Sequence, residues 1–255
     1  MNIVTYDGSF EGLLTAIFEI YEYKIQQPVI YKNDAAPGTL FGCVHHAITN
    51  EEKVNRVLKK LKDKLTNNAV MQFYKTFLSE IKEIENVLLR YVNYALLSKH
   101  SIENDFGHPD VLMLQQTSRK VDREKHRMKA FVRFQCTKDQ LYYAIIQPDY
   151  NVLPLILKHF KDRYADQRWL IYDSIRKAGL YYDLEKVEEV SMQFDTDLNN
   201  KEQLKAIYDE HEELYQSLWQ NYFQSVNIKA RKNMKLHIQH MPRRYWKGLV
   251  EKQGY

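Results

Sequence analysis

The N-terminal part of the chain combines one short apolar run with a series of helical patterns. Residues 2–6 are typical of a short strand, and residues 29–31 could form a second one. Ser9 is placed to cap a first helix. Together these patterns predict a mainly helical N-terminal lobe over residues 1–105. Helices are expected at 10–21, 67–79 and 81–98. A further helix should begin after a capping box formed by Thr49 and Glu52.

The pattern changes in the middle of the chain, where apolar and polar residues alternate. Residues 128–136 and 141–146 are β-rich and separated by a short polar turn, which predicts a hairpin. A short helix capped by Asp149 or Asn151 follows, with Pro154 in its first turn. Two further strands are expected at 169–172 and 180–182. The order β-β-α-β-β indicates an antiparallel sheet of about four strands packed with helices.

The last part of the chain begins with a helical stripe of apolar residues from about 201 to 226. We therefore expect an α+β fold: a mainly helical N-terminal lobe, the antiparallel sheet, and a long C-terminal helix. The break at 104–109 separates the first lobe from an α+β nucleic-acid-binding lobe over residues 106–255, and the two are expected to form one compact unit.

Charge is distributed unevenly, although the net charge is only +4. Residues 183–213 hold eleven acidic and three basic residues, whereas residues 214–255 hold eight basic residues and one acidic residue. Such asymmetry indicates a polyanionic partner. The first residues do not resemble a signal peptide, and 18 apolar residues never run together, so we expect a cytoplasmic protein without membrane contact. Cys43 and Cys136 do not match a zinc or disulfide pattern.

The basic tail is the strongest chemical signal, because cations neutralise phosphates and aromatic rings stack on exposed bases. The alternative is an ordinary solvated basic surface. A second basic cluster either extends the same nucleic-acid-binding groove or is a charged helix end, and Asp122 and Glu124 dilute its charge. It consists of Arg119, Lys120, Arg123, Lys125, Arg127 and Lys129. The predicted nucleic-acid-binding residues are Arg127, Arg133, Lys229, Arg231, Lys235, Arg243, Arg244, Tyr245 and Trp246.

Acid–base chemistry has weaker candidates in His126, His159 and Asp173. Imidazole and carboxylate groups can transfer protons or hold a metal, but these spacings match no metalloenzyme motif. Structural roles are the alternative, since Asp173 stands at a strand end. The residues do not form a complete ligand set, so neither a metal nor a cofactor is expected, and no catalytic residue is assigned.

Five segments combine into a specific pattern: YDGSFEGLL (6–14), DREKHRM (122–128), FVRF (131–134), DYNVLPL (149–155) and MPRRYW (241–246). Together they resemble a bacterial DNA-metabolism and DNA-repair protein family built on a domain of unknown function. In that family the domain occurs alone or is fused to a uracil-DNA-glycosylase-like domain, and the solitary form is often encoded beside a radical S-adenosylmethionine (SAM) protein. The resemblance implies a role in DNA repair with a radical SAM partner, and the family supplies no established catalytic residues to carry over.

Three functions are consistent with these features. The first is a nucleic-acid-binding accessory factor for a radical SAM or glycosylase-type enzyme, with DNA as ligand and RNA as an open alternative. The second is a metal-dependent hydrolase or nuclease acting on DNA. The third is a protein–protein scaffold that docks the partner enzyme through the acidic segment at 202–213.

Overall fold

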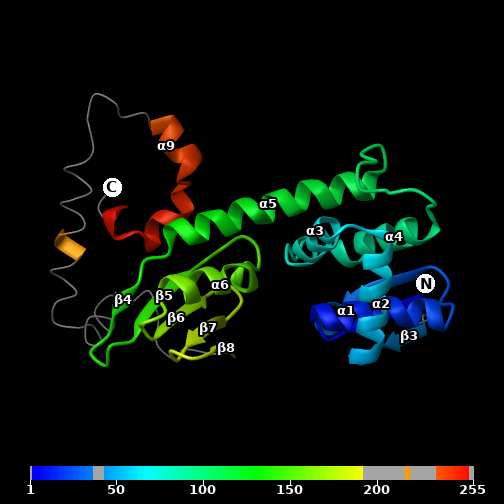
Figure 1. The fold of residues 1–255 in the computed structure, drawn as a ribbon, viewed down its shortest axis with the longest axis horizontal. Coiled ribbons are helices and arrows are strands. Elements are labelled where there is room, and N and C mark those ends of the chain that lie inside the picture. The colour runs from blue at the N-terminus through cyan, green and yellow to red at the C-terminus, as the bar shows by residue number, and fades with distance from the viewer. Residues whose placement is uncertain (1, 37–42, 192–215, 219–233, 253–255) are drawn as a thin grey trace. The chain divides into compact units, whose positions relative to one another are not determined.

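The structure is a computed structural model that describes residues 2–36, 43–191, 216–218 and 234–252 (Figure 1). The chain divides into two compact units, Met1–Asp122 and Arg123–Tyr255. The division falls inside helix α5 (Pro109–Phe131), whereas the sequence pattern indicated a division between residues 105 and 106. Within the described residues, no helix is long and apolar enough to cross a membrane.

The first unit contains a three-stranded parallel sheet, where the sequence predicted one short strand and a possible second in a mainly helical lobe. The strands are β1 (Asn2–Tyr6), β2 (Pro28–Lys32) and β3 (Cys43–His46), in the order β2-β1-β3. Strand β3 was missed because its sequence, CVHH, lacks an apolar run. A short 3₁₀ turn, η1 (Asn33–Ala35), follows β2.

Helix α1 (Phe10–Glu22) follows β1 directly, and the predicted cap is confirmed because the Ser9 hydroxyl accepts a hydrogen bond from the Gly12 amide. The Asp7 carboxylate accepts bonds from the amide and hydroxyl of Ser9 and from the Thr49 hydroxyl, at 2.9, 2.6 and 2.7 Å. A Cβ atom on Gly12 would lie 2.1 Å from this carboxylate. Glycine at position 12 therefore leaves room for Asp7.

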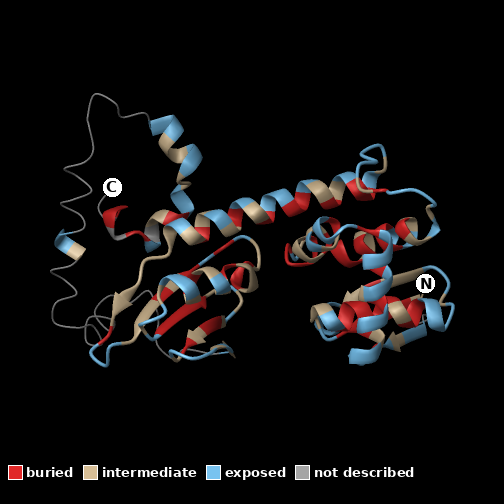
Figure 2. Ribbon diagram, viewed as in Figure 1, coloured by how far each residue is buried: buried red, intermediate tan, exposed pale blue. Residues whose placement is uncertain are grey.

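Three more helices complete this unit: α2 (Glu51–Lys64), α3 (Asn67–Phe77) and α4 (Ile84–Leu97). The predicted capping box at Thr49 is wrong by one residue, since the Asn50 side chain caps α2 and the Thr49 hydroxyl bonds Asp7 instead. Helix α4 covers the edge of β2, where the Asn86 amide oxygen accepts the Ile30 N–H at 2.9 Å. Buried residues line β1 and the inner face of α1 (Figure 2).

The second unit contains a five-stranded sheet with the order β4-β5-β6-β7-β8. Its strands pair antiparallel except β5 and β6, which are parallel and are connected through helix α6 (Leu153–Arg163). The prediction of a fully antiparallel sheet of about four strands is therefore only partly correct. The strands are β4 (Gln135–Cys136), β5 (Tyr142–Ile146), β6 (Trp169–Asp173), β7 (Ala178–Tyr182) and β8 (Val187–Ser191).

Two local predictions in this unit are corrected by the structure. Residues 128–131 are the last turn of α5 rather than a strand, so only the end of the predicted hairpin forms. Helix α6 starts after Val152 without a side-chain cap, since neither Asp149 nor Asn151 caps it, and Pro154 lies in its first turn as expected. The predicted helix at 201–226 lies outside the described residues apart from 216–218.

The C-terminal segment consists of α9 (Met234–His240), η3 (Arg243–Gly248) and η4 (Val250–Lys252). Tyr245, Leu249 and Glu251 are buried, so this segment is part of the packed unit. The ring centres of Tyr245 and Phe131 are 5.4 Å apart, which places η3 against the end of α5.

Candidate nucleic-acid interface

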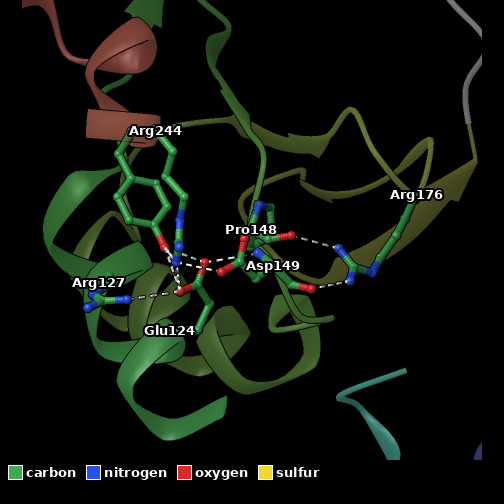
Figure 3. A network of polar contacts seen from close by, with 7 residues as sticks. Glu124, Arg127, Pro148, Asp149, Arg176 and Arg244 are labelled. Carbon is green, nitrogen blue, oxygen red and sulfur yellow. Dashed lines mark hydrogen bonds and ion pairs between the residues drawn. The ribbon is translucent and has the colours of Figure 1, made fainter. Parts of the chain in front are cut away.

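The Glu124 carboxylate is the centre of a polar network in the second unit (Figure 3). Its side chain is only 1% exposed, and a buried carboxylate needs hydrogen-bond partners to replace the water that it has lost. The Tyr245 hydroxyl lies 2.6 and 2.5 Å from its two oxygens, and the Asp149 amide donates to it at 3.0 Å. Burial, and then the bond to Glu124, raise the pKa of Tyr245 far above its usual value, so the hydroxyl stays protonated and donates.

Two arginines from distant parts of the sequence meet at this carboxylate. Nη2 of Arg244, in η3, lies 3.1 Å from Glu124 Oε2, and Nη1 of Arg127, one turn further along α5, lies 3.7 Å from the same oxygen. Arg244 and Glu124 are 120 residues apart in sequence. Nη2 of Arg244 also lies 2.6 Å from Asp149 Oδ2 and contacts the Tyr245 hydroxyl.

The loop that carries Asp149 is held by Arg176 (Figure 3). Nη1 of Arg176 donates to the Pro148 carbonyl at 3.1 Å, and Nη2 donates to the Asp149 carbonyl at 3.3 Å. The fully buried Asp173 carboxylate holds Arg176 in place at 2.8 Å and accepts the Ile175 amide at 2.9 Å. Because β5 and β6 are parallel, their carboxyl ends bring these two loops together.

A second ion pair fixes the C-terminal segment at the end of α5. Nη2 of Arg133 lies 2.8 Å from the buried Glu251 carboxylate, and Nη1 donates to the Ala130 carbonyl at 2.7 Å. Next to it, the Trp246 ring has the Arg243 guanidinium carbon 5.8 Å and the Lys252 ammonium 5.3 Å from its centre. The Trp246 indole N–H donates to the Met241 carbonyl at 3.0 Å.

Comparisons with known proteins place this region in a family. A family model described as a domain of unknown function, DUF4130, matches residues 82–251. The chain belongs to the DUF4130 family. The expectation of a domain of unknown function is thereby confirmed, and the matched segment contains every residue of the network. No curated protein matches the chain.

Among solved structures, the chain is similar to one named as the pGpG-specific phosphodiesterase PggH from Vibrio cholrae. The sequence identity is 9% and the TM-score is 0.33, with 89% of this chain and 99% of that chain covered.

Within the DUF4130 segment, the predicted binding residues occupy different environments. Arg243, Arg244 and Lys235 are exposed, and Trp246 is half-buried. Arg127 and Arg133 are partly buried beside carboxylates, and Tyr245 is buried with its hydroxyl on Glu124. Lys229 and Arg231 lie outside the described residues.

The acid–base candidates are not joined in the structure. His126 is exposed on α5, His159 is half-buried on α6, and Asp173 is committed to Arg176 and the turn after β6. Within the part of the chain that the structure describes, no hydrogen bond or ion pair joins these three residues, and no three His, Cys, Asp or Glu side chains are grouped to hold a metal ion.

Sequence reasoning missed Glu124 and Arg176 as members of the site. Glu124 was interpreted only as a charge that dilutes the basic cluster. Its spacing of three residues from Arg127 was the local signal for an ion pair on α5. The contacts to Arg244 and Tyr245 depend on the tertiary fold, so no local pattern could indicate them.

Proposed function

We propose that this DUF4130 protein binds nucleic acid, with DNA as its ligand, through a surface built from α5 and η3. The observation that carries the proposal is the meeting of the two predicted basic clusters at Glu124, where Arg127 and Arg244 flank one carboxylate. The two clusters, far apart in the sequence, thus form neighbouring parts of one surface.

Exposed arginine side chains on this surface support phosphate binding. Arg123 is exposed one turn before Arg127 on α5, and Arg243 is exposed on η3. Within the described residues, the Arg243 guanidinium makes no hydrogen bond or ion pair, and its one ring contact is with Trp246. A guanidinium beside an aromatic ring can pair with a phosphate while the ring lies near a base, as in single-strand binding sites.

The protein's place in DNA metabolism is the second part of the proposal. Its support is the resemblance of the chain to DNA-repair proteins found with radical SAM or glycosylase-type enzymes. We propose that the chain acts as an accessory factor which holds DNA for such a partner enzyme in the cytoplasm. Association of the purified chain with a radical SAM protein in the presence of DNA is the expected result of a pull-down, and no association would contradict the accessory role.

A charge-removing variant at Arg243 tests nucleic-acid binding. Arg243→Ala removes an exposed cation without touching the Glu124 network. We expect weaker binding to a single-stranded oligonucleotide, and a log–log salt slope smaller by about 0.7, the value for one phosphate contact. Fluorescence anisotropy at several salt concentrations measures both.

Arg163→Ala is the matched control. Arg163 is also exposed and lies 5.8 Å from the centre of the half-buried Tyr164 ring, the same arrangement as Arg243 and Trp246. We expect its affinity and slope to equal those of the wild type. Equal behaviour of the two variants, or no binding by the wild type at low salt, would refute the proposed surface.

A further inference from the structure

The ion pair between Asp149 and Arg244 differs from the other contacts of the network in its exposure. The Asp149 side chain is 45% exposed and that of Arg244 is 42% exposed, whereas Glu124 is 1% exposed. A dissolved anion can therefore reach this pair. Exposed ion pairs contribute little to stability, so exchanging one carboxylate for another anion costs little.

Arg244 has donor groups left over for an incoming anion. All of its polar contacts within the described residues involve Nη2, which lies near Glu124, Asp149 and the Tyr245 hydroxyl. Its Nη1 and Nε groups have no hydrogen-bond acceptor there. A guanidinium presents its N–H groups as a planar fork, which suits the two oxygens of a phosphate.

The Asp149 main chain is fixed while its carboxylate is held only from one side. The Asp149 amide donates to Glu124, and its carbonyl accepts from Arg176. The carboxylate contacts Arg244 through Oδ2 alone within the described part of the chain. Rotation of the side chain would thus free Arg244 without moving the loop.

The local charges point to a singly charged anion. Arg127 and Arg244 contribute two positive charges, and Glu124 and Asp149 contribute two negative ones. Since Glu124 is buried, Asp149 is the anion that can leave. A phosphodiester carries the same single charge, so exchanging it for the Asp149 carboxylate keeps the cluster neutral.

We propose that Asp149 occupies a phosphodiester site on Arg244 and that a backbone phosphate of bound nucleic acid displaces it. This inference rests on the proposed function and adds a residue that limits its affinity. Asp149 competes with every phosphate for Arg244, so it weakens binding and reduces its dependence on salt.

The variant Asp149→Asn tests the displacement because it removes the competing charge and keeps the size of the side chain. We expect an oligothymidylate to bind roughly two- to fivefold more tightly, the value of a half-exposed ion pair. The log–log salt slope should steepen by about 0.7, because the phosphate now meets an uncompensated cation.

Two controls separate the displacement from general electrostatics. Asp166→Asn removes an equal charge from an exposed residue of the same unit, and we expect little change. In an Arg244→Gln background, Asp149→Asn should no longer tighten binding. Inorganic phosphate, added as a competitor, should displace the oligonucleotide only weakly from each variant.

The outcomes distinguish this inference from the proposed function. Wild-type binding with equal effects of Asp149→Asn and Asp166→Asn would overturn the displacement and leave the interface standing. Tightening by Asp149→Asn of inorganic phosphate alone would assign the site to free phosphate and also overturn the inference. Failure of the wild type to bind any oligonucleotide would overturn both proposals.

Discussion

Removing the Tyr245 hydroxyl should weaken the second unit measurably, because this group donates to a buried carboxylate. In Tyr245→Phe, Glu124 keeps the Asp149 amide at 3.0 Å and Arg244 at 3.1 Å but loses its closest donor. A hydrogen bond to a charged group contributes about 1.5–3 kcal/mol. For a unit of this size, that loss corresponds to a decrease in melting temperature of roughly 5–10 °C.

Tryptophan fluorescence can follow this unit separately, since the three tryptophans, at positions 169, 219 and 246, all lie after residue 122. The matched control is Tyr181→Phe, because the half-buried Tyr181 makes no hydrogen bond through its hydroxyl within the described residues. We expect the control to change the free energy of unfolding by less than about 0.5 kcal/mol. Equal losses in both variants would refute the role assigned to Tyr245.

Two further predictions concern other parts of the chain. Gly12→Ala should destabilise the first unit by roughly 1 kcal/mol, because the lost Asp7 hydrogen bonds outweigh the helix-propensity gain of about 1 kcal/mol; increased protection in hydrogen exchange across β1 and α1 would contradict this. Burial, and then the charges of Lys129 and Arg163, lower the pKa of His159, so the folded chain favours the neutral imidazole. The unfolded chain takes up a proton at this residue below about pH 6.5, and the folded state therefore loses stability as the pH falls below that value. His159→Gln should therefore flatten the decrease in melting temperature between about pH 7.5 and 5.5, and His126→Gln should not; equal slopes would refute this explanation.

Much of the fold could be predicted from the sequence where the residues of an element show a clear helical or strand pattern by themselves. The periodicity of α1 and the apolar runs of β6 and β7 indicate these elements with nearly correct bounds. The edge strand β8 was missed because its sequence, VEEVS, has exposed glutamates at its centre. The end of α5 was assigned to a strand because a short apolar alternation fits both periods.

The candidate site shows a different limit. The basic and aromatic composition of the tail was sufficient to suggest its residues as candidates for nucleic-acid binding. Their distribution between buried and exposed positions could not, because it depends on partners 120 residues away, such as Glu124 for Arg244 and Tyr245. The parallel pairing of β5 and β6, which brings Asp149 and Asp173 to one edge, is likewise a property of the strand–helix–strand connection.

Photo-crosslinking of the full chain to a single-stranded oligonucleotide containing bromodeoxyuridine, with mass-spectrometric mapping, tests the shared surface most directly. The proposed interface predicts crosslinked peptides from both the α5 segment at 123–133 and the C-terminal segment at 241–252, with the Trp246 peptide among them. Crosslinks confined to residues before 123, or to one of the two segments alone, would contradict a nucleic-acid surface formed by α5 and η3 together.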